Sequence, residues 1–134
     1  MPIGLWIADK NGKLLRGNPA GVKIWGAEPK VPVEEYGVFS ARRLPSGEPI
    51  APEDWALAHT VRDRVTVKDE LLEIDAFDGQ KRVILNYTAP VESETGELIG
   101  AIVVNNDITE LQQAEKQLRE SEERYRALVD NLPG

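Results

Sequence analysis

Few side chains in this sequence have the type and spacing that enzyme chemistry requires. The chain has no cysteine and one histidine, His59, so cysteine nucleophiles, disulfides and cysteine-ligated zinc are excluded. The sequence contains no glycine-rich phosphate-binding loop and no motif of a serine nucleophile. Its acidic residues do not recur at metal-ligand spacing. We therefore expect neither catalytic residues nor a metal site, and a small enzyme is only a remote alternative.

The remaining candidates are better suited to binding a small ligand than to changing one. Arg42 and Arg43 can pair with a carboxylate or phosphate group, or can lie solvated at the surface. Asn86 interrupts an apolar run, where an amide can orient a ligand or face water. Large rings can line a ring-sized site or simply pack in the core. The candidate pocket residues are Trp25, Tyr36, Phe39, Trp55, His59 and Asn86, with Tyr87 as a further ring.

The composition indicates one domain with an acidic surface. The chain has 134 residues, of which 41% are hydrophobic, and this is enough for one modest core. Its formal net charge of −7 argues against a nucleic-acid partner or an anionic membrane surface, since both attract basic proteins. No apolar run approaches the ~20 residues of a membrane span. We expect no membrane insertion of this part and a cytoplasmic location, although a longer parent protein can still be tethered to a membrane.

The N-terminal half must position these rings with short elements. Two apolar runs flank the turn 9–12, which ends in Asn-Gly, and this pattern predicts a β-hairpin. Asn18 as a cap and Gly26 as a terminator predict a short helix between them. Residues 27–51 are rich in Pro and Gly, which predicts loop with short helical turns. A second helix is expected to start near Pro52.

Three strands are expected in the second half. In 65–76 the apolar side chains change sides near 69–71, which predicts a β-bulge. Residues 83–91 alternate with a period of two. The side chains that share one face of this strand are Val83, Leu85, Tyr87, Ala89 and Val91. Residues 98–106 are apolar on both faces, as in a central strand. Hairpin-linked strands with helices grouped between them predict an α+β fold, in which helices cover one face of an antiparallel sheet.

The last strand is expected to run directly into a long helix. Asp107 and Glu110 form an Asp-x-x-Glu capping box, in which Asp107 accepts from backbone N–H groups and Glu110 reaches back. Apolar side chains then recur at intervals of three and four, as in a heptad repeat. The members of this coiled-coil seam are Leu111, Ala114, Leu118, Ser121, Tyr125 and Leu128. So narrow a stripe needs a partner, either the same helix of a second chain, which we favour, or the helix's own domain.

Several segments together resemble a PAS domain, the sensory box of bacterial and archaeal signalling proteins. The segment "GLWIADKNGKLLRGNPAG" resembles its opening hairpin and first helix, and "FDGQKRVILNYTAPVESETGELIGAIVVNNDITE" resembles its closing three strands with the PAC motif. The junction residues Asp107, Ile108, Thr109 and Glu110 resemble the motif that couples such domains to a signalling helix. The resemblance implies a five-stranded antiparallel sheet of order 2-1-5-4-3, short helices on one face, and a pocket between helices and sheet.

The resemblance also implies signal transduction rather than catalysis. It divides the chain into a sensor domain, 1–106, and a coiled-coil signalling helix, 107–134. That helix would lead to an output domain, for which a histidine kinase of a two-component phosphorelay is expected. The expected partners are a second copy of the chain and adjacent PAS and kinase domains. The end "YRALVDNLPG" resembles the entry of a following sensor domain, and the entry helix that precedes many PAS domains is absent here.

The sequence leaves the ligand open. Without cysteine, the cysteinyl-flavin photochemistry of light-sensing members is not available. His59 falls about one turn from the ligand position of haem-binding members, which argues against haem. Non-covalent flavin and a small metabolite stay as candidates. The alternative is a ligand-free module that only dimerises and relays a signal from upstream domains.

Overall fold

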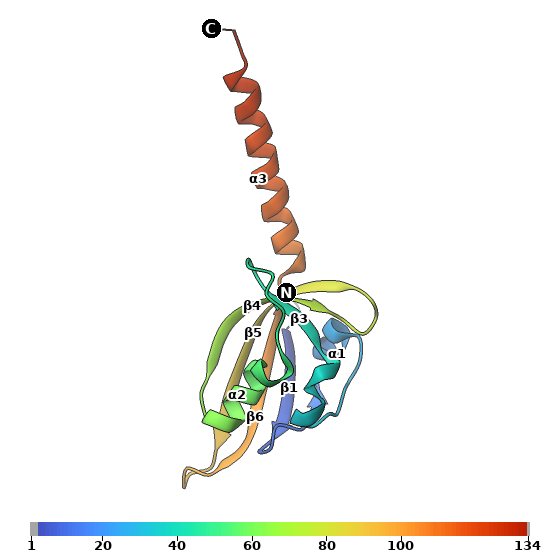
Figure 1. The fold of residues 1–134 in the computed structure, drawn as a ribbon, viewed down its shortest axis with the longest axis vertical. Coiled ribbons are helices and arrows are strands. Elements are labelled where there is room, and N and C mark those ends of the chain that lie inside the picture. The colour runs from blue at the N-terminus through green and yellow to red at the C-terminus, as the bar shows by residue number, and fades with distance from the viewer. Residues whose placement is uncertain (1–2, 134) are drawn as a thin grey trace.

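A six-stranded antiparallel sheet organises residues 3–133, which are the residues that the computed structural model describes (Figure 1). The strand order is β2-β1-β6-β5-β4-β3. The strands are β1 (Ile3–Asp9), β2 (Leu14–Gly17), β3 (Ser40–Arg43), β4 (Val67–Asp75), β5 (Lys81–Glu92) and β6 (Leu98–Asp107). The long β6 lies between β1 and β5, so the strand that is apolar on both faces is central, as its sequence predicts.

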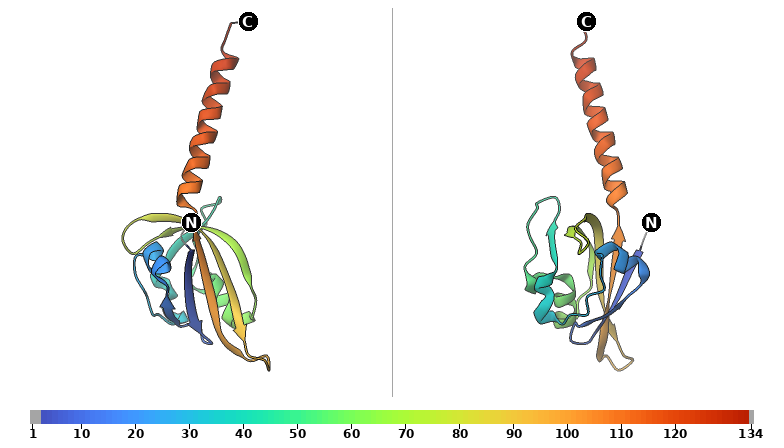
Figure 2. Two further views of the ribbon diagram at one scale, coloured as in Figure 1. Left: turned by 180° about the vertical axis from the view of Figure 1, so that it is seen from behind. Right: turned by 90° about the vertical axis from the view of Figure 1, so that its right-hand side faces the viewer.

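Short helices cover one face of this sheet, which confirms the predicted α+β class (Figure 2). They are α1 (Pro19–Trp25), α2 (Ala56–Asp63) and two 3-10 helices, η1 (Val33–Val38) and η2 (Pro52–Asp54). The helix expected near Pro52 is therefore a 3-10 turn first, and the α-helix starts only at Ala56.

The strand count is one higher than the five expected. The additional strand, β3, pairs with β4 at the sheet edge, with Arg42 opposite Glu73. Without β3 the order of the other five strands is the expected one. The sequence of β3 gives little sign of a strand, because the segment is only four residues long and lies within a Pro- and Gly-rich stretch. Its extended form depends on the partner strand rather than on its own alternation.

Local side-chain contacts explain the N-terminal turns. In the hairpin, Asp9 Oδ1 accepts from the backbone N–H groups of Asn11 and Lys13, each at 2.9 Å. At the start of α1, Asn18 Oδ1 accepts from Gly21 N at 2.7 Å. Gly26 ends this helix with a φ of 76°, a left-handed conformation in which glycine is favoured. Asn18 Oδ1 also accepts from Leu5 N at 2.9 Å, which holds the start of α1 against β1, and the last residue of α1, Trp25, faces the cavity.

The predicted β-bulge lies in β4. The pairing of β4 with β5 shifts register between Val67 and Glu70, and Asp69 has a φ of 50°. After the bulge, Leu72 and Ile74 are fully buried on the helix-covered face. The change of apolar parity in the sequence therefore marks the point where this strand turns its other side toward the core.

Strand β5 turns its even-numbered side chains toward the helices, whereas a ligand site that uses Tyr87 requires the odd-numbered ones to face them. Ile84, Asn86 and Thr88 are buried on the helix-covered face. Val83, Leu85 and Tyr87 share the other, outer face, so Tyr87 is not a pocket residue. The more polar side of the strand is inside because its amide and hydroxyl groups find buried partners. The outer face continues onto β1, where Ile3, Leu5 and Ile7 are exposed.

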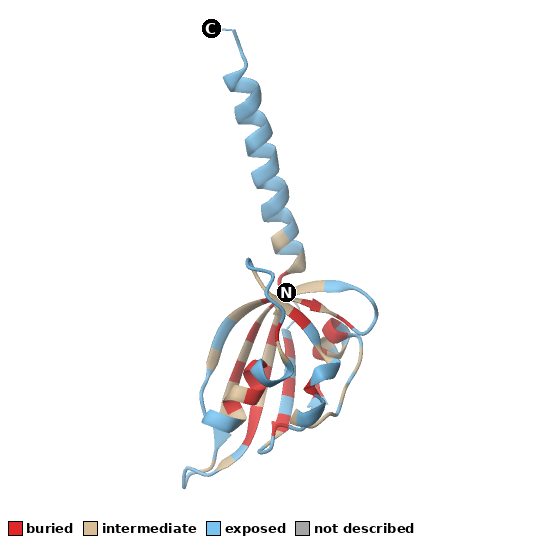
Figure 3. Cartoon of the chain, in the orientation of Figure 1, coloured by how far each residue is buried: buried red, intermediate tan, exposed pale blue. Residues whose placement is uncertain are grey.

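Helix α3 (Thr109–Asp130) leaves the sheet and projects away from it (Figure 1). None of its residues is buried, and Figure 3 shows it exposed along nearly its whole length. Leu118, Tyr125 and Leu128 of the predicted seam are 61–70% exposed. The helix therefore does not lay its apolar stripe on its own domain. No helix within 3–133 combines the length and apolar character needed to cross a membrane.

Candidate ligand pocket and signalling junction

A cavity of about 60 Å³ lies between the sheet and the covering helices. Its walls come from β1, β2, β5 and β6 on one side and from α1, η1 and the segment around α2 on the other. The lining residues are Trp6, Leu14, Trp25, Pro29, Tyr36, Phe39, Trp55, Leu57, Asn86, Thr88, Val103 and Asn105. No charged side chain is among them, so within the described residues the cavity is a neutral site.

The structure brings five of the six predicted pocket residues together. The members that line the cavity are Trp25, Tyr36, Phe39, Trp55 and Asn86. His59 does not line it and faces outward on α2. Its ring nitrogens lie 3.6 Å from Asp54 Oδ1 and 3.9 Å from Asp63 Oδ2, and Arg62 Nη2 lies 2.6 Å from His59 Nδ1. His59 belongs to a surface cluster on α2, so the inclusion of His59 among the pocket residues is wrong.

The sequence reasoning missed the sheet side of the cavity. The residues not predicted are Trp6, Leu14, Pro29, Leu57, Thr88, Val103 and Asn105. Two of them carried a usable sign. Trp6 alternates with the small residues Gly4 and Ala8, which identifies the buried side of β1. Asn105 is a polar residue at the end of an apolar central strand, where burial requires hydrogen-bond partners.

Asn105 is the centre of a buried polar network. Its Oδ1 accepts from Trp6 Nε1 at 3.0 Å and from Trp25 Nε1 at 3.2 Å. Its Nδ2 donates to Asn86 Oδ1 at 2.8 Å on the neighbouring strand. An indole N–H can only donate, so the two tryptophans require the oxygen of Asn105 to face them. That orientation turns the amide nitrogen of Asn105 toward Asn86, and Asn86 therefore accepts this hydrogen bond with its side-chain oxygen.

Two further hydroxyl contacts complete the polar part of the cavity. Thr60 Oγ1 and Thr88 Oγ1 lie 2.7 Å apart and join α2 to β5. The hydroxyl of Tyr36 donates to the backbone oxygen of Gly12 in the hairpin turn. Burial raises the pKa of the Tyr36 phenol well above its usual value, and the nearby charges of Asp9 and Glu34 add to this. The phenol therefore stays neutral, and its hydrogen bond joins η1 to the hairpin.

Aromatic rings form the helical side of the cavity. The Trp25 and Phe39 ring centroids are 5.3 Å apart, and the Trp55 centroid lies 6.2 Å from Trp25 and 5.8 Å from Phe39. All three pairs have edge-to-face geometry, which aromatic rings favour in proteins. Two indole N–H groups belong to this wall: Trp25 Nε1 donates to Asn105, whereas Trp55 Nε1 is buried and has no hydrogen-bond partner within 3–133.

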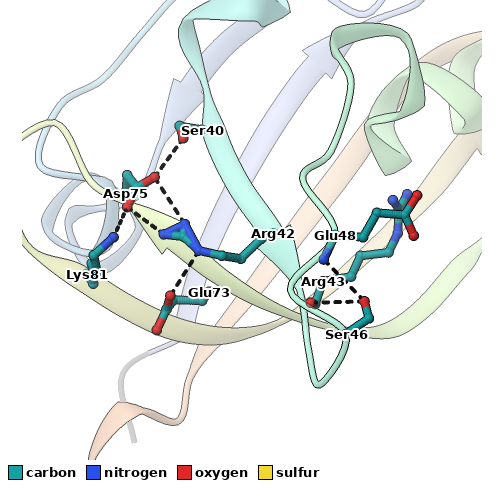
Figure 4. Close-up of polar contacts among 8 residues, drawn as sticks. All are labelled: Ser40, Arg42, Arg43, Ser46, Glu48, Glu73, Asp75 and Lys81. Atoms are coloured by element: carbon teal, nitrogen blue, oxygen red, sulfur yellow. Dashed lines mark hydrogen bonds and ion pairs between the residues drawn. The ribbon is translucent and has the colours of Figure 1, made fainter.

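The two arginines considered as anion ligands are occupied by the chain's own carboxylates. Arg42 Nε donates to Glu73 Oε1 at 3.0 Å, and its Nη2 donates to Asp75 Oδ1 at 2.7 Å (Figure 4). Arg43 Nε lies 3.5 Å from Glu70 Oε2. These pairs join β3 to β4, so both side chains stabilise the edge strand rather than a free anion site.

Asp75 has the most strongly shifted carboxyl group of this network. Its oxygens accept from Lys81 Nζ at 2.8 Å and from Ser40 Oγ at 2.6 Å (Figure 4). These two hydrogen bonds, with the charge of Arg42, lower the pKa of Asp75 from 3.8 to about 2. Within 3–133, no group of three or more His, Cys, Asp or Glu side chains is placed to hold a metal ion.

The junction between β6 and α3 is held by side chains, but not as the predicted capping box. Asp107 Oδ1 accepts from Thr109 N at 2.9 Å and from Thr109 Oγ1 at 2.6 Å. The residue before the helix is Ile108, which has no capping side chain, and Glu110 is exposed with no hydrogen bond to the cap among the described contacts. The short Asp107–Thr109 turn satisfies the first donor instead, so Glu110 is not needed for it.

The same junction is also bonded to β5. Val83 N donates to Thr109 Oγ1 at 3.0 Å, and Ile108 N donates to the backbone oxygen of Val83 at 2.9 Å. Ile108 is buried. Because Asn86 pairs with Asn105 and Ile84 pairs with Asp107 in the β5–β6 ladder, the pocket network and the junction lie two residues apart on the same two strands. The first turn of α3 is therefore bonded to the same strand that carries Asn86.

This geometry defines a class of protein: a small α+β domain with an internal pocket that is joined without a loop to a projecting helix. A family model described as "PAS fold" matches residues 1–113. The chain therefore belongs to the PAS fold family, whose members are typically regulatory sensor modules. A comparison with curated proteins finds no match.

Two solved structures share this fold over most of the chain. A sensory box histidine kinase/response regulator from Burkholderia thailandensis is 23% identical, with a TM-score of 0.53 over 94% of this chain and 92% of that chain. The PAS domain of BvgS from Bordetella pertussis is also 23% identical, with a TM-score of 0.53 over 90% of this chain and 86% of that chain. At these identities the likeness establishes the fold alone.

A third structure shows the fold inside a longer receptor. An RNA-binding Light-Oxygen-Voltage receptor is 18% identical and has a TM-score of 0.61. The match covers 92% of this chain and 34% of that receptor. The present chain thus spans about a third of that protein.

Proposed function

We propose that this chain is a sensory module in which the state of the cavity is transmitted through the β6–α3 junction to α3. One observation supports this above the others: the Val83 N to Thr109 Oγ1 hydrogen bond ties the start of α3 to the strand that carries Asn86. A ligand that changes the Asn86–Asn105 pair would shift β5 relative to β6. The Asp107–Thr109 turn would then rotate or tilt the helix.

The output element of this proposal is α3 paired with the same helix of a second chain. Its apolar seam, Leu111 to Leu128, is exposed in the monomer, and heptad spacing is typical of a two-stranded coiled coil. Residues 1–106 then form the sensor and 107–134 the transmitter. Adjacent domains of the parent chain receive the signal. A histidine kinase output is supported by the "LRESEERYRALVDNLPG" resemblance and by a fold neighbour of that kind.

The junction is tested by a matched pair of variants. Thr109→Val removes the hydroxyl that receives the Val83 N–H, whereas Thr109→Ser keeps it. We expect Thr109→Val to fold, with about 1–2 kcal/mol lower unfolding free energy for the lost bonds. In the full signalling protein its output should no longer respond to the stimulus, and Thr109→Ser should respond like the wild type. Normal signalling by the folded Thr109→Val protein would refute the proposed route.

A ligand-free relay is the second candidate, because the exposed seam of α3 supports dimerisation without any use of the cavity. Native mass spectrometry of the purified chain, with an absorption spectrum of the same sample, separates the two. A dimer that carries a bound small molecule supports the sensor. A bare dimer favours the relay, in which only the helix and its junction have a role.

A further inference from the structure

Two hydrogen-bond donors at the cavity lack a protein partner, and they indicate which ligand it accepts. Trp55 lines the cavity and is 7% exposed, and its Nε1 is buried without a partner within 3–133. Asn86 also lines the cavity and is 5% exposed. Its Oδ1 accepts from Asn105, and among the described contacts its Nδ2 donates to no group. Leaving a buried donor such as Trp55 Nε1 unpaired costs about 1–3 kcal/mol, so a ligand acceptor at this atom would stabilise the site.

The free amide nitrogen of Asn86 follows from the network itself. Trp6 and Trp25 both need an acceptor, and Asn105 supplies its Oδ1 to both. The Nδ2 of Asn105 must then donate, and Asn86 must present Oδ1 to it. The NH₂ end of Asn86 is therefore directed away from Asn105. Because both indoles can only donate, they leave Asn86 with an amide N–H that is free to donate to a ligand.

The charge and the volume of the cavity restrict the class of ligand further. No Lys, Arg, His, Asp or Glu lines the cavity in the described chain, so an ionised ligand would lose hydration without gaining a counter-ion. The volume of about 60 Å³ has room for about four to six water-sized groups. This space therefore suits a small molecule better than a three-ring flavin or a haem.

We propose that the cavity binds a small neutral molecule, about one ring in size, that presents a hydrogen-bond acceptor to Trp55 Nε1 or Asn86 Nδ2. A ketone, an amide carbonyl and a ring nitrogen share this chemistry. The inference rests on the sensory function proposed above and names its ligand class. It also assigns a binding role to Trp55, whose N–H has no structural role among the described contacts.

Three probes of equal non-hydrogen atom count test the inference on the intact chain. Cyclopentanone is neutral and carries an acceptor, methylenecyclopentane has the same shape without one, and cyclopropanecarboxylate is an anion. The chain has three tryptophans, so NMR of the indole N–H groups gives three signals, of which Trp55→Phe removes and assigns one. We expect cyclopentanone to bind at least about fivefold more tightly than either other probe and to shift the Trp55 signal downfield.

Variants identify the donor. Trp55→Phe removes an N–H that has no protein partner, so the fold should be retained while the preference for cyclopentanone over methylenecyclopentane falls severalfold. Tyr87→Phe, an aromatic change on the outer face, should leave that preference unchanged. Equal or tighter binding of methylenecyclopentane would overturn the assigned ligand class, and so would the absence of binding by all three probes. Neither result affects the test of the junction with the Thr109 variants. A failure of the proposed ligand class can therefore be distinguished from a failure of the proposed signalling route.

Discussion

Substitution of Asn105 by leucine offers a sharp test of the polar network. The change keeps the approximate volume but removes both the acceptor and the donor. It leaves Trp6 Nε1, Trp25 Nε1 and Asn86 Oδ1 without their partner. Each buried group left unpaired costs about 1–3 kcal/mol. Three such groups give a loss of roughly 3–9 kcal/mol, and the gain from burying leucine in place of an amide offsets part of it. We expect a net loss of about 3–5 kcal/mol, a large share of the ~5–15 kcal/mol stability of a typical domain.

The adjacent residue provides the matched control. Asn106 follows Asn105 on β6 and therefore faces the other side of the sheet. Its Oδ1 is buried and has no partner within the described residues. Asn106→Leu is the same chemical change, but it removes an amide oxygen that is already unpaired. We expect it to change the unfolding free energy by less than about 1 kcal/mol, or to raise it.

Urea unfolding followed by tryptophan fluorescence measures both variants, because two of the reporting indoles belong to the network. With a slope of ~2 kcal/mol per M, Asn105→Leu should lower the midpoint by about 2 M, and Asn106→Leu should lower it little or not at all. Equal midpoints for the two variants would refute the reasoning, since they would show that solvent in the cavity already serves the indole donors.

Two further predictions concern α3 and the sheet edge. Leu118→Gln, on the seam, should weaken dimerisation measured by sedimentation at least about tenfold, and Lys116→Gln, on the opposite side of the helix, should not; equal effects would argue against the seam. Because the folded pKa of Asp75 lies near 2, below its ordinary 3.8, its stabilising contribution is present above pH 3.8 and is lost as the pH falls toward 2. Asp75→Asn should therefore flatten the acid side of the stability–pH curve, and an unchanged slope would show that the network does not act on folding.

Local sequence patterns were sufficient for the elements that carry their own chemistry. Asn18 and Gly26 bound α1 because a cap and a left-handed terminator act within a few residues. The bulge in β4 was visible because a register shift changes the side of every later residue. The edge strand β3 was not visible, since its four residues become a strand only through pairing with β4 and through the Arg42 ion pairs. Such pairings depend on distant residues that no local window contains.

The residues of the candidate site also differ in how far the local sequence predicts them. Trp25, Trp55 and Asn86 were predictable as large rings and as a polar residue within an apolar strand. Tyr87, the further ring considered for the site, does not line the cavity, and the sequence could not show this because period-two alternation does not say which face of the strand is covered. His59 was chosen by residue type, but its neighbours Asp54, Arg62 and Asp63 hold it in a surface cluster. Asn105 is marked by its polarity within an apolar strand, but its hydrogen-bond partners could be identified only with knowledge of which elements are neighbours.

The position of the network also bears on how a signal would pass. A buried polar cluster adds little net stability, because each group loses its hydration on folding, but it strongly disfavours arrangements in which a donor is left alone. Asn105 and Asn86 are joined across β6 and β5, and the next register pair toward α3 on the same side is Ile84 with Asp107. A ligand that takes the Asn86 amide as a donor therefore acts next to the strands' link to Thr109. Partial displacements of this pair are costly, so the two strands should adopt one of two discrete arrangements, and α3 should rotate between two positions rather than drift.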